Sequence, residues 1–350
     1  MEWEQAAARQ LGLDWDVRIF CPEGSIERSE VVVYAPAIGV PDSRLAKLVT
    51  WLRVKIAYYK WLRERMAEVD VFMLRYYVHD PFQLLFLLTC KKPVVLVHHT
   101  LEVPELSLQG QSGRIRAALE WALGPFCIRA ASLIAGVTNE IVSYELERSN
   151  ARAKPRLTYP NGILYTDATV IDDRADGPEI IFVAGHFSAW HGLDLLLDAL
   201  EASSANCVIH LVGQLSREDQ VRADRDLRIR CHGVLSAAAI RDISRRCSLG
   251  LSSLALHRNK MKEACTLKVR EYLMMGLPVY AAYKDVFPTD FPFFKEGAPD
   301  LDQIVEYAKQ CASFSREEVS SQSRVHIEKS ILLGQFKSQL AEALGGHMTI

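Results

Sequence analysis

The segment that begins at Glu263 reads EACTLKVREYLMMGLPV, with seven residues between Glu263 and Glu271. It predicts a loop that feeds a helix opening near Thr266. The helix is expected to close at Gly276, because glycine suits the position after a helix end and Pro278 cannot continue a helix. The first turn of such a helix offers unpaired backbone N–H groups and the positive end of the helix dipole. These features suit the binding of a diphosphate.

The charged side chains of this stretch suit an elongated ligand rich in hydroxyl groups. Glu263 lies in the loop before the predicted helix, and Glu271 lies about one and a half turns inside it. The two carboxylates can therefore accept hydrogen bonds from hydroxyl groups at two ends of one ligand. Lys268, in the first turn, can meet the charge of a phosphate. Two glutamates at this spacing also occur by chance on surface helices, so the surrounding residues carry the argument.

The whole phrase resembles the EX7E motif of retaining GT-B glycosyltransferases, especially glycosyltransferase family 4. In that family the first glutamate addresses the donor hexose and the second addresses the ribose of the nucleotide. The resemblance implies a catalytic role for Glu263 and a donor-binding role for Leu267, Lys268 and Glu271. It also implies a GT-B fold, in which two Rossmann-like domains face each other across a cleft.

A second match lies upstream, where the sequence from Phe182 reads FVAGHFSAWHGLDLLL. It resembles the first strand, loop and helix of the family's C-terminal domain, and Gly185 would let the backbone turn close to a ligand. The family often has Arg and Lys where this chain has His186 and His191. Both histidines are donor-binding candidates, although a plain strand–helix turn would also carry them. The missing positive charge is expected from one of three lysines: Lys260, Lys262 or Lys268.

In the first half of the chain, the apolar run PVVLV ends in two histidines, His98 and His99. Ligands of doubly wound sheets sit outside the carboxyl ends of the strands. The family carries a histidine at this strand end, near the donor sugar, so His98 is taken as the catalytic candidate. His99, Glu102 and Arg75 are acceptor-side candidates. A purely structural role at the strand end is equally open for either histidine.

Short apolar runs alternate with helical patterns along the chain, which is typical of an α/β fold with parallel sheets. We expect an acceptor-side Rossmann-like domain at 1–165, a nucleotide-sugar-binding domain at 166–330, and a C-terminal helix at 331–350 that packs back on the first domain. An Asp-rich linker is expected at 166–178. Strands are expected at 17–21, 31–34, 69–74, 94–98, 133–137, 157–159, 180–184, 208–212, 227–230, 250–253 and 279–281.

The beginning of the sequence resembles the helix that follows the first strand and Gly-rich loop of a GT-B domain. Residues 1–12 read MEWEQAAARQLG, and the next apolar run starts near Trp15. We therefore expect the first strand of the N-terminal sheet to be missing from this chain or to be encoded upstream of Met1. Acceptor binding depends on which of these holds.

Composition narrows the classes of function. A net charge of −2 over 350 residues does not favour a nucleic-acid partner. The eight cysteines form no CxxC pair, and the three short DxD triplets are too unspecific to indicate a metal site, so no metal and no cofactor beyond the donor substrate are expected. No secretory signal is visible, and a cytoplasmic protein is expected.

Residues 43–67 carry seven Lys and Arg residues interleaved with Trp and Tyr. A basic helix with aromatic residues suits an anionic membrane surface, although aromatics that face the core and charges that face water would give the same pattern. We expect a peripheral protein on the inner face of the cytoplasmic membrane.

The sequence thus predicts a retaining hexosyltransferase that moves a sugar from a nucleoside-diphosphate sugar to a lipid-linked or polysaccharide acceptor. Two alternatives remain open. A nucleotide-sugar epimerase of the same fold would bind the same donor, and a non-catalytic GT-B subunit would fit the incomplete N-terminus.

Overall fold

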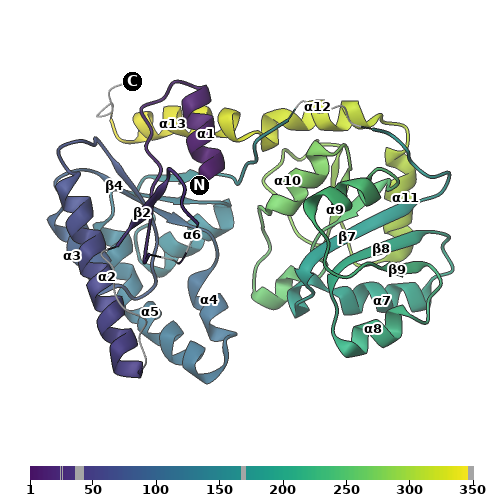
Figure 1. The fold of residues 1–350 in the computed structure, drawn as a ribbon, viewed down its shortest axis with the longest axis horizontal. Helices are drawn as coiled ribbons and strands as arrows, with labels where there is room; N and C mark the ends of the chain where they lie inside the picture. The colour runs from purple at the N-terminus through teal and green to yellow at the C-terminus, as the bar shows by residue number, and fades with distance from the viewer. Residues whose placement is uncertain (24, 26, 36–42, 167–170, 346–350) are drawn as a thin grey trace. The chain divides into compact units, whose positions relative to one another are not determined.

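The computed structural model describes residues 1–23, 25, 27–35, 43–166 and 171–345 (Figure 1). The chain forms two compact units: unit 1 is Met1–Tyr159 with Leu333–Ile350, and unit 2 is Pro160–Leu332. Residues 167–170 of the predicted linker lie outside the described residues. Both units are α/β with parallel sheets, which confirms the predicted fold class.

Unit 2 contains a six-stranded sheet in the order β12-β11-β10-β7-β8-β9, and all neighbours are parallel. Its strands are β7 (Glu179–His186), β8 (Val208–Gln214), β9 (Ile229–Cys231), β10 (Leu249–Leu251), β11 (Val279–Ala281) and β12 (Phe294–Glu296). This is the doubly wound order. Strands β8 and β9 are added on one side of β7, and strands β10, β11 and β12 are added on its other side, so the strand order reverses between β7 and β10. Ligands of such sheets bind at the carboxyl ends of those two strands, here β7 and β10.

Helices cover both faces of this sheet because successive strand residues point to opposite sides. Ile180 and Phe182 of β7 pack with one group of helices, and Ile181 packs with another. The first group is α7 (Leu193–Ala202), α8 (Arg217–Ala223) and α11 (Leu301–Cys311). The second group is α9 (Ala237–Ser244), α10 (Leu267–Met274) and α12 (Arg316–Ile327).

Unit 1 contains a four-stranded parallel sheet whose strands follow chain order. Its strands are β3 (Phe72–Arg75), β4 (Val94–His98), β5 (Leu133–Gly136) and β6 (Arg156–Thr158). Two further strands, β1 (Ile19–Cys21) and β2 (Val32–Tyr34), pair only with each other within the part of the chain that the structure describes. The sequence placed these two runs in the same domain but did not separate them from the main sheet.

The sheet of unit 1 is also covered on both faces. One face packs against α2 (Arg44–Glu64), α3 (Pro81–Thr89), α5 (Gly110–Ala130) and α6 (Asn139–Arg148). The other face packs against α1 (Glu2–Gln10) and α13 (Lys329–Ala343), which contributes Leu333, Phe336 and Leu340 to that core. The short helix α4 (Glu102–Ser107) follows β4. No described helix combines the length and the hydropathy needed to cross a membrane.

Candidate functional site

Helix α10 has the limits that the sequence predicted. Thr266 is its N-cap and makes no side-chain cap hydrogen bond, so this side chain leaves the first-turn N–H groups to other partners. The helix closes at Gly276, which has a φ of +74°. A Cβ atom at this glycine would lie 2.5 Å from the Cβ of Arg316, so a larger residue would meet both strain and a clash.

A buried ion pair fixes the start of α10. Arg270 donates from Nη2 to Oδ1 of Asp285 at 2.5 Å and from Nη1 to Oδ2 at 2.6 Å, and both side chains are fully buried. Arg270 Nε also donates to the carbonyl of Asn161, whose side-chain amide donates to the carbonyl of Cys265. The loop that carries Glu263 is thereby tied to the Pro-Asn-Gly turn. The sequence predicted no role for Arg270 or Asp285.

The loop after β7 presents a neutral imidazole. The backbone N–H of Ser188 donates to His191 Nδ1 at 2.9 Å, so the proton of the neutral ring lies on Nε2. Burial lowers the pKa of His191 to about 4, and the charges of Lys268 and His186 act in the same direction. The carbonyl of His191 accepts from the N–H of Leu254 at 2.8 Å, which ties this loop to the residues after β10. His191 therefore lies at the reversal point of the sheet.

Lys268 and Glu271 lie close together at the same edge. The Nζ of Lys268 is 5.6 Å from the ring centroid of Phe182, a residue of β7. Burial lowers the pKa of Lys268 to about 8, with an opposing effect of the Glu271 charge. Burial raises the pKa of Glu271, and the charge of Lys268 offsets part of that rise. One cation, one carboxylate and the imidazole of His191 therefore interact electrostatically.

Gly185 and His186 continue β7 rather than forming a turn. Gly185 does not have a positive φ, and a Cβ atom there would meet nothing within 4 Å. The prediction that this glycine allows a backbone turn is therefore wrong, although it faces open space. His186 Nε2 lies 2.8 Å from the hydroxyl oxygen of Ser188.

The remaining donor-side candidates lie on the loop before α10 and at its first turn. Glu263 is half-buried, and its backbone forms a parallel bridge with Lys284. Leu267, the first residue of the helix, is 43% exposed. Lys260 and Lys262 are exposed, and Lys268 is the lysine that the structure brings beside His191.

In unit 1 the two neighbouring histidines have opposite environments. His98 is fully buried, its ring is stacked on Tyr76 at 4.4 Å, and its Nδ1 lies 2.9 Å from Oε1 of Glu102. Burial lowers the pKa of His98 to about 4 and raises the pKa of Glu102 to about 8. His99 and Arg75 are exposed at the ends of β4 and β3. Of the four unit 1 candidates, only His99 and Arg75 present their side chains to solvent.

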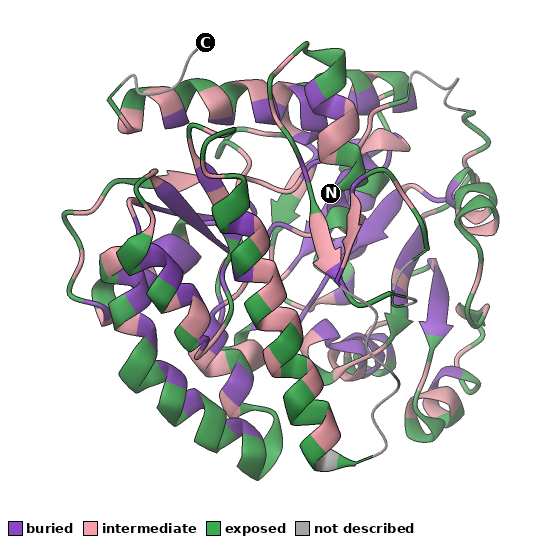
Figure 2. Ribbon diagram, turned by 60° about the vertical axis from the view of Figure 1, so that its left-hand side comes forward, coloured by how far each residue is buried: buried purple, intermediate pink, exposed green. Residues whose placement is uncertain are grey.

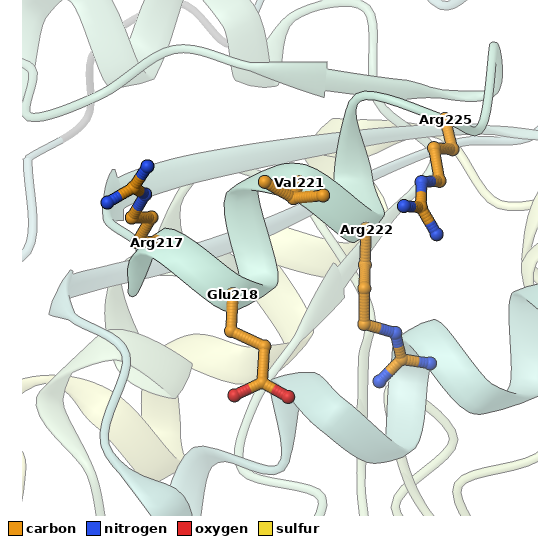
Figure 3. A pocket seen from close by; sticks show the side chains of 5 residues that line it. All are labelled: Arg217, Glu218, Val221, Arg222 and Arg225. Carbon is orange, nitrogen blue, oxygen red and sulfur yellow. The ribbon is translucent and has the colours of Figure 1, made fainter.

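A shallow hollow of about 510 Å³ lies over α8, away from these residues (Figure 3). Arg217 and Glu218 point away from each other there. Arg222 is already paired with Asp198 and Glu201. This hollow is a surface feature of the helix and not part of the candidate site.

Comparison with known proteins finds similarity in structure only. No protein-family model matches the sequence, and no curated protein matches it either. A glycosyltransferase from Rickettsia africae has a TM-score of 0.61 at 12% identity over 98% of this chain and 94% of that one. Sucrose-phosphate synthase from Thermosynechococcus elongatus has a TM-score of 0.61 at 15% identity over 97% and 92%. HepE from Anabaena, in complex with UDP and glucose, has a TM-score of 0.58 at 16% identity over 89% and 85%. The chain therefore has the fold of GT-B glycosyltransferases.

Proposed function

We propose that this protein is a glycosyltransferase that takes a sugar from a nucleoside-diphosphate sugar and retains its anomeric configuration. The observation that carries the proposal is the edge between β7 and β10. There the first turn of α10, the ammonium group of Lys268 and the neutral imidazole of His191 lie together. This combination suits a diphosphate, because it offers a positive charge and several hydrogen-bond donors.

Each group has a distinct role in the proposed reaction. Lys268, the Nε2–H of His191 and the N–H groups of α10 bind the diphosphate and stabilise its charge as it leaves. Glu271 accepts hydrogen bonds from the ribose, and Glu263 holds the hexose in position. The bond from the anomeric carbon to the diphosphate breaks, and the acceptor oxygen bonds to the same face. The departing phosphate oxygen takes the acceptor proton, so no separate base is needed.

On the acceptor side, we assign the substrate-facing role to His99 rather than to His98. His98 is fully buried and already pairs with Glu102. His99 and Arg75 are exposed at the carboxyl ends of neighbouring parallel strands. These ends are where ligands of α/β sheets bind. We propose a lipid-linked or polysaccharide acceptor.

Transfer and epimerisation can be separated in one assay. UDP-glucose is incubated with the protein, with and without a lipid-linked glycan acceptor, and the nucleotide and sugar products are analysed. Release of UDP with a glycosylated acceptor supports the proposal. An epimer formed without acceptor would establish the epimerase instead, and the absence of any turnover with several nucleotide sugars would favour a binding subunit.

The pKa of Lys268 gives a pH prediction for donor binding. Because that pKa is lowered to about 8, the side chain is an ammonium below this pH and loses its charge above it. UDP affinity is therefore expected to fall about tenfold between about pH 7 and about pH 9. Calorimetric titration of UDP at both pH values measures this. UDP binding by Lys268→Met should be weak and nearly independent of pH. Replacement of the exposed Lys260 with methionine should leave UDP affinity and its pH dependence as in the unchanged protein.

We also propose that unit 1 docks on an anionic membrane surface. Leu45, Leu48 and Ile56 are 71%, 52% and 56% exposed along α2. Figure 2 shows exposed and intermediate residues along this long helix. Lys47, Arg53, Lys60 and Arg63 are exposed on the same helix. Exposed aliphatic and basic side chains on one helix suit a membrane interface.

Most aromatic residues of 43–67 follow the alternative that the sequence left open, in which they face the core. Tyr59 is buried in the core of unit 1, and Tyr58 and Trp61 pack against that core. Only Trp51, at 41%, is strongly exposed, and its ring lies 6.0 Å from that of Phe82. The membrane proposal therefore rests on the aliphatic and basic residues.

Replacing Leu45 and Ile56 together with glutamate is expected to abolish binding to vesicles that contain phosphatidylglycerol, because two charges would enter the apolar surface. Vesicle flotation measures this. Leu227, which is 94% exposed in unit 2, provides the matched control, and Leu227→Glu should still float. If the double variant floats with the vesicles as well as the unchanged protein does, α2 is not the membrane-binding element.

A further inference from the structure

The loop between β3 and α3 holds His79 in a backbone conformation that side chains rarely adopt. Its φ is +43°, and Asn150 and Lys260 are the other non-glycine residues with a positive φ in the part of the chain that the structure describes. This conformation costs free energy for a residue with a Cβ atom, so neighbouring contacts must hold it.

Two buried carboxylates hold this loop. The backbone N–H of His79 donates to Oε2 of Glu120 at 2.6 Å. Glu120 is fully buried and accepts in turn from Nη2 of Arg148 at 2.7 Å. The next residue, Asp80, is buried as well and accepts from Nζ of Lys55 at 2.6 Å. The backbone of His79 is therefore fixed by the core, while its side chain takes no part in these contacts.

The side chain of His79 meets Arg116 of α5 at the surface instead. Nε of Arg116 donates to Nε2 of His79 at 3.3 Å, so the proton of the neutral ring lies on Nδ1. Nη1 of Arg116 lies 3.4 Å from Oε1 of Gln109, and no carboxylate of the described residues pairs with this guanidinium. Nη2 of Arg116 and Nδ1 of His79 keep hydrogens that no described acceptor takes. The loop and α5 thus bring together two hydrogen-bond donors, one of them charged.

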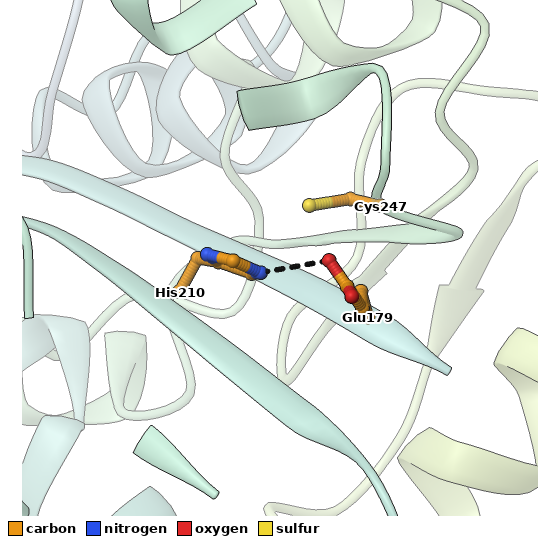
Figure 4. A group of neighbouring side chains, drawn as sticks. All are labelled: Glu179, His210 and Cys247. Atoms are coloured by element: carbon orange, nitrogen blue, oxygen red, sulfur yellow. Dashed lines mark hydrogen bonds and ion pairs between the residues drawn. The ribbon is translucent and has the colours of Figure 1, made fainter. Parts of the chain in front are cut away.

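The ionisable group formed by Glu179, His210 and Cys247 in unit 2 has a different character (Figure 4). Nε2 of His210 lies 3.0 Å from Glu179, and Nδ1 lies 2.9 Å from Nε2 of His232. Glu179 also pairs with Arg246. The members of this group are buried and both ring nitrogens of His210 have partners, so the group presents no donors to a ligand as the pair in unit 1 does.

Helix α5 presents only positive charge to solvent. Arg114, Arg116 and Arg129 are exposed, whereas Glu120, the one acidic residue of this helix, has no exposed surface. A surface of one sign attracts the opposite charge. The ligand that suits the pair of His79 and Arg116 is therefore an anion.

An apolar stripe runs along the same helix. Four exposed side chains three or four residues apart lie on one face: Ile115, Leu119, Leu123 and Phe126. Leu119 and Leu123 follow Arg116 by one and two turns on its side of the helix. A cation at the start of an exposed apolar stripe suits an amphiphile with an anionic head group.

We propose that His79 and Arg116 bind the phosphate of a lipid-linked acceptor and that Leu119 and Leu123 contact its apolar chain. A guanidinium and an imidazole N–H suit the several oxygens of a phosphate. A polysaccharide without lipid or phosphate would use neither the cation nor the apolar stripe, so this surface favours the lipid-linked class. Because the lipid is the acceptor of the proposed sugar transfer, the proposal rests on that function.

Three small probes separate the head group from the chain. The full chain is titrated by calorimetry with octyl phosphate, octyl glucoside and inorganic phosphate, with both octyl compounds below micelle formation. We expect octyl phosphate to bind once per chain and the other two to bind at least about tenfold more weakly. Arg116→Gln should weaken octyl phosphate at least about tenfold, whereas Arg114→Gln, on the other side of α5, should bind it normally. Equal binding of octyl phosphate by Arg116→Gln and the unchanged protein, or equal binding of octyl glucoside or inorganic phosphate, would overturn the proposal.

Replacement of His79 with glycine tests why the loop adopts this conformation. Glycine reaches a φ of +43° without strain, so the Tm should not fall. The affinity for octyl phosphate should fall at least about threefold, because the imidazole donor is lost. Unchanged affinity together with a lower Tm would show that His79 serves the fold, and its assignment to the phosphate would be wrong.

Transfer and flotation assays distinguish the acceptor from a membrane phospholipid. With a lipid-linked glycan acceptor, Arg116→Gln should raise KM for that acceptor at least about tenfold and leave UDP affinity unchanged. Flotation with vesicles that contain phosphatidylglycerol should not change. Lost flotation with an unchanged KM would assign the site to phospholipid head groups and overturn the acceptor role. If the unchanged protein transfers no sugar, the proposed function fails, and binding of octyl phosphate that depends on Arg116 would still establish a site for a lipid phosphate.

Discussion

Replacing Glu263 with glutamine is expected to lower kcat/KM for sugar transfer by about 10² to 10³, or roughly 2.7–4 kcal/mol. The substitution keeps the size of the side chain and removes the charge that positions the hexose in the transition state. UDP affinity should change little, because the nucleotide and diphosphate are bound by α10, Lys268 and His191. Initial rates with a nucleotide sugar and acceptor, together with calorimetric titration of UDP, separate the two effects.

A matched control for this prediction is Glu296→Gln, which removes an exposed carboxylate at the end of β12. Its transfer rate should stay close to that of the unchanged protein. If Glu263→Gln transfers sugar at the unchanged rate, the proposed hexose contact is absent. If it loses UDP binding as well, Glu263 supports the loop rather than the reaction.

Replacing Arg270 with methionine is expected to destabilise unit 2 by about 3–5 kcal/mol, because it leaves the carboxylate of Asp285 buried without its partner. Both side chains are fully buried, and without Arg270 the carboxylate of Asp285 keeps the hydrogen bond from the N–H of Val286. The loop before α10 also loses the bond from Arg270 to Asn161. Urea unfolding followed by circular dichroism measures the loss.

Two further variants make this stability prediction specific. The double variant Arg270→Met with Asp285→Leu should recover most of the lost stability, because no unpaired charge remains. Lys60→Met breaks an exposed pair with Glu64 and should cost less than about 1 kcal/mol. A cost of Arg270→Met as small as that of Lys60→Met would show that the buried pair does not hold the loop.

Local signals allowed much of the fold to be predicted from the sequence. The limits of β4 agree with the predicted range 94–98 because an uninterrupted apolar run identifies this strand. The limits of α10 were predicted because Thr266, Gly276 and Pro278 each act on the backbone within a few residues. The reversal point between β7 and β10 followed only from the strand order, which no local pattern contains.

Other features depend on partners far away in the sequence. Arg270 meets Asp285 and Asn161 only after folding, so nothing near Arg270 predicted its burial. His98 and His99 are adjacent and chemically identical, and only the packing of the ring of His98 on Tyr76 separates them. Strand β12 is short and charged, so it has no apolar run by which it could be predicted.

Calorimetric titration of UDP into the unchanged protein and into Glu271→Ala shows whether a nucleotide binds at the edge between β7 and β10. We expect one UDP to bind per chain and Glu271→Ala to weaken this binding at least about tenfold, since the contact with the ribose is lost. Binding of UDP with equal affinity by both proteins, or no binding of UDP, GDP or ADP by the unchanged protein, would contradict a nucleotide site at the edge between β7 and β10.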